Sequence, residues 1–331
     1  MNRGFWDTLP RPFFVLAPMA DVTDTVFRQV IARRGKPDVF WTEFVSCDGL
    51  SSAGREVLLR DLSFSEIERP IVAQVFGAIP EHFFETAKLV ASLGFDGIDI
   101  NMGCPEKNIQ RQGACAALIQ NPTLAQEIIA ATKEGSRRNP DAIKNSGWQA
   151  ENMPVSVKTR IGYHSVEIET WIPKLLETNI AALTVHLRTK KEMSDVPAHW
   201  EYMPRIVEMA KESGTIIIGN GDVKNLDDAR QKADETGADG IMLGRAIFGN
   251  PWAFDLNGKI PTKEEKLVAF VEHARQYEAT WGASKNFDLM KKHCKAYVQG
   301  FPGASGLRAQ LMGCKNADEI AEILSREMVT E

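Results

Sequence analysis

The chain has 331 residues, of which 44% are apolar and 25% are charged, and its formal net charge is −5. This is the composition of an ordinary globular protein. No stretch reaches the roughly 20 consecutive apolar residues of a membrane-spanning helix, and the amino terminus lacks the apolar run of a signal peptide. We therefore expect a cytoplasmic protein that does not enter a membrane. The acidic balance argues against an indiscriminate nucleic-acid coat, and five cysteines without a C-x-x-C pair argue against a disulfide scaffold or a structural zinc site.

Eight short apolar runs rich in β-branched residues recur over the first 250 residues. They are 14–17, 39–45, 71–76, 97–101, 155–159, 182–186, 215–219 and 240–244. Between most of them, apolar residues recur at three- and four-residue spacing, which is typical of amphipathic helices. These helical segments are 81–93, 124–136, 168–177, 200–212 and 226–236. A doubly wound open sheet would give a similar order, but the count of eight favours an α/β fold with a closed (β/α)₈ TIM barrel.

The pattern changes after Trp252, where the strand-like runs stop. Segments 263–280, 288–300 and 317–328 have helical periodicity and no strand between them. We therefore predict a barrel domain over residues 1–254, followed by a small all-helical domain over residues 255–331. A polar segment, 137–153, lengthens the connection into the fifth strand, and we interpret it as a surface insertion.

Nearly every predicted strand ends in a hydrogen-bonding or charged side chain or is followed by one. In a TIM barrel, the active site is built from residues at the carboxyl ends of the strands and from the loops that follow them. The residues at these positions are Pro18, Met19, Glu43, Gln74, Asn101, Lys158, His186, Arg188, Asn220, Asp222 and Arg245. Each could be structural on its own, but so many in phase with the strand ends indicate a functional site.

Glycines lie at the ends of the last two predicted strands, at Gly219 and Gly244, and just after the first of these, at Gly221. TIM barrels often bind a phosphate group at these two loops. Glycine lets main-chain N–H groups approach an anion closely, and Arg245 can add charge-assisted hydrogen bonds. The third glycine of a dinucleotide fingerprint is absent, because Lys224 stands there. The sequence therefore predicts a phosphorylated ligand, and a mononucleotide fits it better than a Rossmann-bound nicotinamide.

Cys104 and Lys158 are the candidate reactive groups. Cys104 lies on a Gly-Cys-Pro turn, where its thiol could be a nucleophile, although the sequence identifies no base beside it, or a proton donor with a pKa of about 8.5. Lys158 ends the fifth strand. It could form a Schiff base, as in a barrel aldolase, or remain a fixed cation that faces an electron-rich cofactor ring.

The order of these motifs resembles that of the tRNA-dihydrouridine synthases over nearly the whole chain. The matching barrel segments are 16–24 (LAPMADVTD), 74–77 (QVFG), 101–105 (NMGCP), 157–160 (VKTR), 186–189 (HLRT), 219–222 (GNGD) and 244–246 (GRA). Lys292-His293, Tyr297 and the segment 300–303 (GFPG) resemble the helical-domain signature of the family. The resemblance thus covers both predicted domains.

The resemblance implies an FMN-dependent oxidoreductase that reduces the C5=C6 bond of specific uridines in tRNA, with NADPH as a transient reductant. Pro18 and Met19 would lie against the flavin ring, Gln74 and Lys158 would contact its polar edge, and Cys104 would be the general acid that protonates C5. The other residues implied to bind the cofactor are Asn101, His186, Arg188, Asn220, Gly221, Asp222, Gly244 and Arg245. The resemblance implies no metal and no stable protein partner.

The predicted helical domain contains a basic segment. From Lys285 to Lys315 there are six cations and one acid, Asp288. Such a run is most often a solvated helix face, but the resemblance favours tRNA binding by this segment. The predicted RNA-binding residues are Lys291, Lys292, Lys295 and Arg308.

Two positions depart from the family pattern. Leu187 stands where the family commonly has glycine, and Cys115 occupies a small-residue position that we interpret as packing. Two other functions remain possible on the sequence. A flavin barrel acting on a free pyrimidine, such as a dihydroorotate-type oxidoreductase, would not require the helical tail. An RNA-binding protein that has lost catalysis would not need to retain Cys104 and Lys158.

Overall fold

A computed structural model describes residues 3–137, 152–248 and 250–329. Nine strands of this part of the chain form one all-parallel sheet in the order β1-β9-β8-β7-β6-β5-β4-β2, with β3 also paired to β4. The strands are β1 (Phe13–Leu16), β2 (Phe40–Trp41), β3 (Val45–Ser46), β4 (Ile71–Phe76), β5 (Gly97–Met102), β6 (Val155–Arg160), β7 (Ala182–His186), β8 (Ile216–Asn220) and β9 (Gly240–Leu243). A parallel bridge between Val15 and Val39 closes the sheet. The predicted TIM barrel is confirmed.

The second predicted strand, 39–45, is divided into β2 and β3. The division lies at Thr42, whose hydroxyl accepts the N–H of Gln74 at 3.0 Å, where a regular ladder would use a backbone carbonyl. The same hydroxyl donates to the carbonyl of Glu43 at 2.8 Å. The side chain of Thr42 thus replaces one ladder bond, and β3 resumes the pairing with β4 three residues later.

Helices surround the barrel. The α-helices are α1 (Thr25–Ala32), α2 (Cys47–Leu50), α3 (Arg55–Leu59), α4 (Pro80–Ser92), α5 (Lys107–Arg111), α6 (Pro122–Gly135), α8 (Ile168–Leu176), α9 (Met203–Ala210) and α10 (Leu226–Thr236). The 3₁₀ turns are η1 (Gly4–Thr8), η2 (Arg60–Leu62), η3 (Glu66–Glu68), η4 (Cys115–Gln120), η5 (Trp200–Tyr202) and η6 (Arg245–Ile247). The five predicted helices correspond to α4, α6, α8, α9 and α10. Of the predicted insertion 137–153, residues 138–151 lie outside the described residues.

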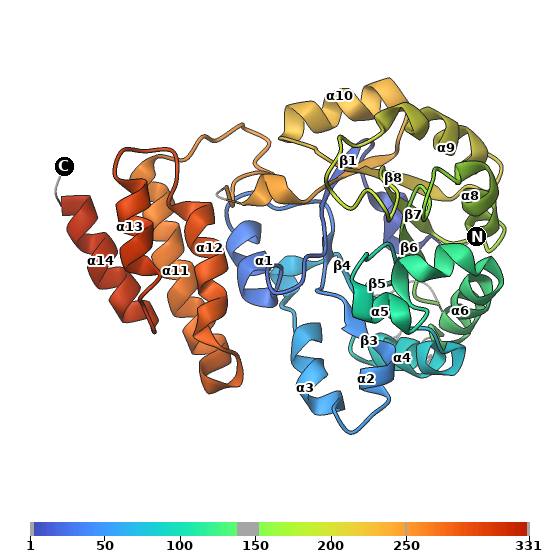
Figure 1. Cartoon of the computed structure of the whole chain (residues 1–331), viewed down its shortest axis with the longest axis horizontal. Coiled ribbons are helices and arrows are strands. Elements are labelled where there is room, and N and C mark those ends of the chain that lie inside the picture. The colour runs from blue at the N-terminus through green and yellow to red at the C-terminus, as the bar shows by residue number, and fades with distance from the viewer. Residues whose placement is uncertain (1–2, 138–151, 249, 330–331) are drawn as a thin grey trace.

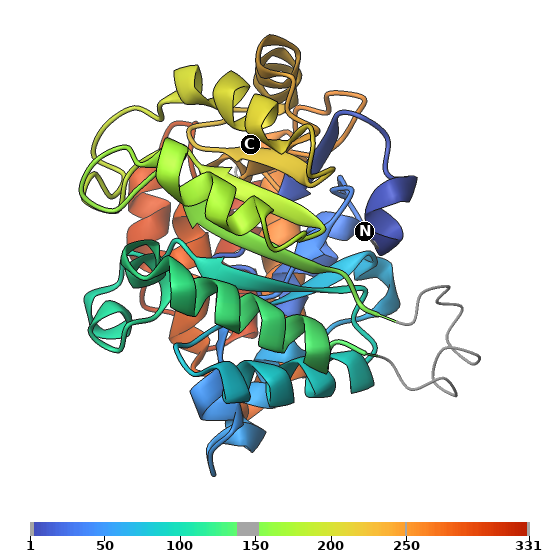
Figure 2. The ribbon, with the colours of Figure 1, turned by 90° about the vertical axis from the view of Figure 1, so that its right-hand side faces the viewer.

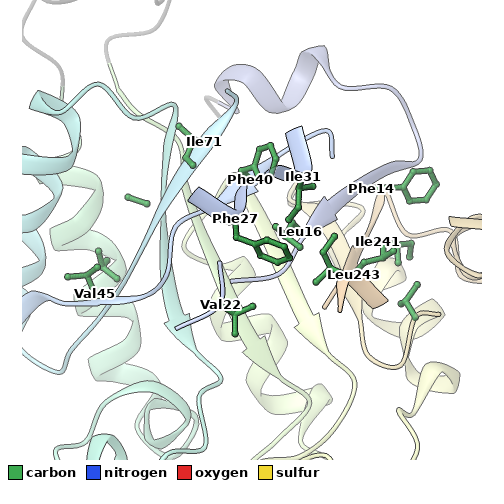
Figure 3. Packing of buried hydrophobic residues seen from close by; sticks show 14 of the residues in the cluster. Phe14, Leu16, Val22, Phe27, Ile31, Phe40, Val45, Ile71, Ile241 and Leu243 are labelled. Atoms are coloured by element: carbon green, nitrogen blue, oxygen red, sulfur yellow. The ribbon is translucent and has the colours of Figure 1, made fainter. Parts of the chain in front are cut away.

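The apolar residues form an inner and an outer layer, because successive residues of a strand point to opposite faces. Val15 of β1 belongs to the inner cluster together with Trp6 of η1. Leu16 belongs to the outer cluster, between the strands and the helices. Figure 3 shows Leu16 close to Phe27 and Ile31 of α1. The barrel interior is therefore a packed core rather than a pore.

The carboxyl-terminal part is helical, as predicted. Its α-helices are α11 (Lys263–Trp281), α12 (Met290–Tyr297), α13 (Ala304–Leu311) and α14 (Ala317–Val329), and its 3₁₀ turns are η7 (Gly282–Ser284) and η8 (Phe287–Leu289). The four α-helices lie together on one side of the barrel (Figure 1), and Figure 2 shows them behind the sheet. Helix α13 was not predicted. None of the helices in the described ranges combines the length and apolarity needed to cross a bilayer.

The helical part packs directly on α1. Phe27 of α1 stacks on His273 of α11, with ring centroids 5.1 Å apart. Asp24 caps α1 by accepting the N–H of Phe27 at 2.9 Å, and its other oxygen accepts the indole N–H of Trp281 at 2.7 Å. One continuous apolar cluster includes Phe27 and Phe270. The boundary at residue 254 therefore remains a prediction, because the two parts share a core.

Candidate active site

A cavity of about 220 Å³ lies at the carboxyl ends of β1, β6, β7, β8 and β9. It is lined by Ala17, Pro18, Met19, Lys158, His186, Arg188, Ser194, Asn220, Gly221, Asp222, Val223, Met242, Gly244 and Arg245. Ten of the twelve residues predicted to bind the cofactor are in this set. The structure therefore brings together residues from five strands that are up to 227 positions apart, between Pro18 and Arg245.

Lys158 is a fixed cation in this cavity. Its Nζ donates to Oδ1 of Asn220 at 3.2 Å, and Nδ2 of Asn220 donates to the carbonyl of Met242 at 2.8 Å, which sets the orientation of the amide. Burial, and then repulsion from Arg160, lower the pKa of Lys158 to about 8. The ammonium group therefore keeps most of its charge at neutral pH.

His186 is neutral. Burial, and then the charges of Lys158 and Arg160, lower its pKa well below the ordinary value. Nη1 of Arg188 lies 3.1 Å from Nε2 of the ring. A guanidinium can only donate, so Nε2 must accept and the proton must reside on Nδ1. His186 is therefore a hydrogen-bonding group of the cavity and not an acid at neutral pH.

Asp222 holds two arginines at the cavity. One carboxylate oxygen pairs with Arg188 and accepts the N–H of Ala198 at 2.9 Å, and the other accepts Nη2 of Arg245 at 2.5 Å. Partial burial acts to raise the pKa of Asp222, but the hydrogen bonds from Arg188 and Ala198 outweigh it and lower the pKa overall. Lys158, Arg188 and Arg245 each carry a positive charge and Asp222 a negative one. The four side chains together leave a formal charge of +2, which suits a phosphate group.

Two glycines complete this anion site. Among the described residues, no hydrogen bond uses the N–H of Gly221 or Gly244. Gly244 lines the cavity together with Ala17, whose Cβ would lie 3.6 Å from a Cβ on Gly244. Gly221 has a φ of +137°, and a Cβ there would lie 2.6 Å from that of Ala198. The N–H groups of both residues are thus available to an anion, and the positive φ and the close approach to Ala198 require glycine at position 221.

Gln74 and Asn101, the other two predicted cofactor residues, lie inside the barrel in a hydrogen-bonded chain. Nε2 of Gln74 donates to Oδ2 of Asp99 at 2.7 Å, and its Oε1 accepts Nδ2 of Asn101 at 3.0 Å. Oδ1 of Asn101 then accepts the N–H groups of Gly103 and Cys104, both at 3.0 Å. Asn101 therefore fixes the turn that carries Cys104.

The sequence analysis did not identify Asp99 as a member of this hydrogen-bonded group of side chains. Burial raises the pKa of Asp99 to about 6, against hydrogen bonds from Ser156 and Gln74. The signal that could have found it is an ionisable residue in the middle of the buried strand β5, two positions before Asn101 and therefore on the same face. An acid in such a strand needs polar partners inside the barrel.

Cys104 is a half-buried thiol at the same end of the barrel. A hydrogen bond from Cys115 is the largest influence that lowers its pKa, to about 7, and the positive charge of Arg160 acts in the same direction. Nε of Arg160 donates to the carbonyl of Gly103 at 2.7 Å and so also supports the turn. Arg160 was not predicted as a site residue, although it shares a strand face with Lys158 two positions away. The arrangement can deliver a proton at neutral pH.

Comparison with known proteins identifies the family. The model described as Dihydrouridine synthase (Dus) matches residues 15–331. The chain belongs to the dihydrouridine synthase family. The "Probable tRNA-dihydrouridine synthase 2" of Bacillus subtilis (strain 168) is 41% identical over 329 residues, which is 98% of this chain and 96% of that protein. The "Probable tRNA-dihydrouridine synthase" of Staphylococcus aureus (strain COL) is 41% identical over 331 residues, at 98% and 95% coverage.

Among solved structures, a complex of 2-naphthoyl-CoA reductase with 2-naphthoyl-CoA aligns with a TM-score of 0.54 and 10% identity. The alignment covers 73% of this chain and 49% of that one. At this identity the likeness shows a shared fold alone. The resemblance to the dihydrouridine synthases that the motifs predicted is confirmed by the family model and by the relatives.

The four predicted RNA-binding residues lie on two helices of the carboxyl-terminal part. Lys291, Lys292 and Lys295 are on α12, and Arg308 is on α13. Lys295 is exposed, and Lys291 and Lys292 form surface ion pairs with Asp288 at 2.6 Å and Asp21 at 2.7 Å. Arg308 is half-buried, and its Nη1 donates to the carbonyl of Val298 at 2.8 Å. Three of the four therefore present exposed or weakly paired cations, whereas Arg308 also has a structural bond to the backbone.

Proposed function

We propose that this chain is a tRNA-dihydrouridine synthase, which uses NADPH and bound FMN to reduce the C5=C6 bond of specific uridines in tRNA. The observation that carries the proposal is the geometry of one barrel end. A cavity with a net charge of +2 and free main-chain N–H groups lies at the same end as a thiol whose pKa is close to 7. The family supplies the reaction to which these groups are suited.

The residues of the cavity fit FMN. Gly221 and Gly244 would offer their N–H groups to its phosphate, and Arg188 and Arg245, held in place by Asp222, would offer charge. The other residues that we assign to the cofactor are Pro18 and Met19 beside the ring, and Lys158, His186 and Asn220 along its polar groups, with Gln74 and Asn101 below them. FMN reduced by NADPH would supply the hydride that adds to C6 of the uracil.

Cys104 would supply the proton. Hydride addition at C6 leaves negative charge at C5, because the C5=C6 bond is conjugated with the C4 carbonyl. The S–H bond of Cys104 breaks, its proton forms the C5–H bond, and the thiolate later recovers a proton from water. A general acid is most effective when its pKa is near the working pH, and the pKa of Cys104 is about 7. Lys158 would stabilise negative charge on the cofactor ring.

The helical part would hold the tRNA. A uridine in folded tRNA must leave its stack to reach a barrel end, at a cost of a few kcal/mol that backbone contacts offset. We assign these contacts to Lys291, Lys292, Lys295 and Arg308, so that residues 255–331 form the tRNA-binding domain and residues 1–254 the FMN-binding catalytic domain. Because tRNA and NADPH are cytoplasmic, we propose that the protein works in the cytoplasm without a stable protein partner.

The experiment that tests this function is the substitution Cys104→Ala, with Cys314→Ala as the control that removes a buried thiol of the helical part. We expect Cys104→Ala to keep bound flavin and its reduction by NADPH, both followed by absorbance. We expect dihydrouridine formation on a uridine-containing tRNA transcript to fall by at least 100-fold, within the range of general acid catalysis.

Three results would contradict the proposal in different ways. Near-normal dihydrouridine formation by Cys104→Ala would remove Cys104 from the proton transfer. Purified wild-type protein that neither contains nor takes up FMN would remove the cofactor. Turnover of a free pyrimidine in preference to tRNA would favour the dihydroorotate-type alternative.

A further inference from the structure

A second cavity, of about 360 Å³, lies between the barrel and the helical part. Its barrel side includes Ala20, in the loop that follows β1, Glu43, between β2 and β3, and Asp61, in η2. Its helical side includes Lys285, between η7 and η8. Ala20 directly follows Met19, which lines the cavity that we assign to FMN. The second cavity is therefore next to the proposed site of reaction.

Glu43 is a buried acid in the wall of this cavity, and only 7% of the residue is exposed. Within the described part of the chain, its carboxylate accepts no hydrogen bond. The nearest cation, Nζ of Lys285, lies 3.6 Å away and is bonded to Asp61 at 2.7 Å. Burial raises the pKa of Glu43 to about 7, so the fold stabilises the ionised form poorly. A ligand that brings a hydrogen-bond donor to Glu43 would remove this cost.

The charge of the cavity suits a nucleobase better than a phosphate group. Three carboxylates line it, those of Asp21, Glu43 and Asp61, together with two cations, Arg60 and Lys285. With all of them ionised, the formal charge is −1. A phosphate would be repelled here, in contrast to the basic surface of α12. The amino group of a nucleobase is a hydrogen-bond donor that carboxylates accept.

We propose that this cavity binds a nucleobase of the tRNA other than the target uridine, and that Glu43 accepts a hydrogen bond from the exocyclic amino group of that base. The inference rests on the proposed function, in which the target uridine leaves its stack and thereby unstacks its neighbours. Adenine, cytosine and guanine carry an exocyclic amino group, whereas uracil carries none. Phe44 supplies an aromatic wall against which an unstacked base can pack. Glu43 would therefore make the enzyme selective for the sequence around the uridine.

The test is an interference experiment on tRNA binding by the holoenzyme. Each transcript carries, at a random position, one phosphorothioate nucleotide without its amino group: inosine for guanosine, purine riboside for adenosine, or pyrimidin-2-one riboside for cytidine. Bound and unbound transcripts are separated, and iodine cleavage identifies the positions at which loss of the amino group prevents binding. The wild type is compared with Glu43→Gln and with the control Glu85→Gln, which neutralises an exposed glutamate outside the cavity.

We expect the wild type and Glu85→Gln to show interference at a nucleotide near the reduced uridine, and Glu43→Gln to lose interference at that nucleotide alone. A transcript that lacks this amino group should bind the wild type about 10-fold more weakly than the complete transcript. Glu43→Gln should distinguish the two transcripts by less than about twofold, because the partner of the amino group is already gone. A merely structural role of Glu43 would weaken the binding of both transcripts equally.

The same interference pattern for the wild type and Glu43→Gln would overturn the inference, as would an equal loss of interference in Glu85→Gln. If Glu43→Gln does not fold, Phe44→Leu removes the aromatic wall and should suppress interference at the same nucleotide, and an unchanged pattern would again overturn the inference. A wild type that binds no tRNA would contradict the proposed function and the inference together. Interference requires neither NADPH nor turnover, so failure of the cavity to read a base is distinguishable from failure of the reaction.

Discussion

Cys104 and Lys158 both lose a proton as the pH rises, with pKa values of about 7 and about 8. The hydrogen bond from Cys115 lowers the first, and burial lowers the second. The protonated form of each is the one that the proposed reaction needs. The pH dependence of the chemical step should therefore have its fall on the alkaline side only.

We expect the single-turnover rate of the prereduced enzyme on a tRNA transcript to be level below about pH 6 and to fall as the pH rises through 7. In Cys104→Ser the hydroxyl does not titrate in this range. The rate of this variant at low pH should be lower than that of the wild type, and it should fall only near pH 8, where Lys158 loses its proton. Single-turnover rates of the prereduced enzyme between pH 5.5 and 9 measure this. A fall near pH 7 that persists in Cys104→Ser would assign it to another group.

Arg245 is the exposed member of the pair of arginines at the cavity, with 65% of its side chain accessible. Its replacement should therefore affect the ligand more than the fold. Arg245→Met should weaken FMN binding by about 10-fold, the equivalent of one charge-assisted hydrogen bond of about 1.4 kcal/mol. Quenching of flavin fluorescence by the apoprotein measures the affinity. Arg205→Met, at an exposed ion pair with Glu169, is the matched control, and equal losses in the two variants would contradict the assignment.

At the scale of elements, α1 and η3 are joined by a fully buried ion pair. Nε of Arg28 lies 2.5 Å from Oε2 of Glu68, and neither side chain is accessible. The other two guanidinium nitrogens of Arg28 are also bonded: Nη1 donates to the carbonyl of Thr23 at 2.6 Å, and Nη2 to that of Ser63 at 2.7 Å. Each nitrogen of the Arg28 guanidinium therefore has a hydrogen-bond acceptor. Removal of Arg28 would leave the Glu68 carboxylate buried without a counter-charge.

We expect Arg28→Met to lower the free energy of unfolding by about 3–5 kcal/mol, because Glu68 would remain buried without its cation. The exposed pair of Arg205 and Glu169 again supplies the control, and Arg205→Met should cost less than about 1 kcal/mol. Guanidinium chloride unfolding followed by circular dichroism measures both. Similar costs for the two variants would show that the buried pair does not hold α1 in place.

Periodicity predicted the elements that are long and regular. The barrel strands and the helices α4, α6, α8, α9 and α10 were predicted from apolar spacing alone, because one face of each must be buried. The division of the second strand was not, since it depends on a hydroxyl of Thr42 that replaces a backbone acceptor. Helix α13 was missed because Ser305 and Gly306 obscure its period.

The location of the candidate site was also predictable from the sequence, but the contacts within it were not. Strand ends converge in a barrel, so the positions of Lys158, His186 and Arg245 in the sequence were enough to expect them at one cavity. The partners of each side chain were not predictable, because they come from distant segments. Asp222 as the anchor of Arg188 and Arg245 is a contact that only the folded chain reveals.

At the scale of the molecule, the helical part and the barrel form one body through α1 (Figure 1). Phe27 is 1% exposed and lies between the two parts, and Lys285 pairs with Asp61 of the barrel at 2.7 Å. Deletion of residues 255–331 would uncover this apolar face, so loss of activity after deletion would not separate unfolding from lost RNA binding. Point substitutions of surface cations are the sharper test of tRNA binding.

The triple variant Lys291→Ala, Lys292→Ala, Lys295→Ala should weaken tRNA binding and raise KM by about 10-fold or more, with reduction of the flavin by NADPH unchanged. Each phosphate contact contributes about 0.7–0.9 to the slope of log affinity against log salt. The slope should therefore become less steep by about two.

The control variant Lys88→Ala, Lys174→Ala, Lys211→Ala removes the same charge from the barrel. These lysines lie late in α4, late in α8 and just after α9. Because barrel helices run antiparallel to the strands, the ends of these helices lie at the amino-terminal face, opposite the cavity. We expect the control to bind tRNA with the wild-type salt dependence. Equal slopes for the two triple variants would mean that tRNA approaches the barrel by another surface.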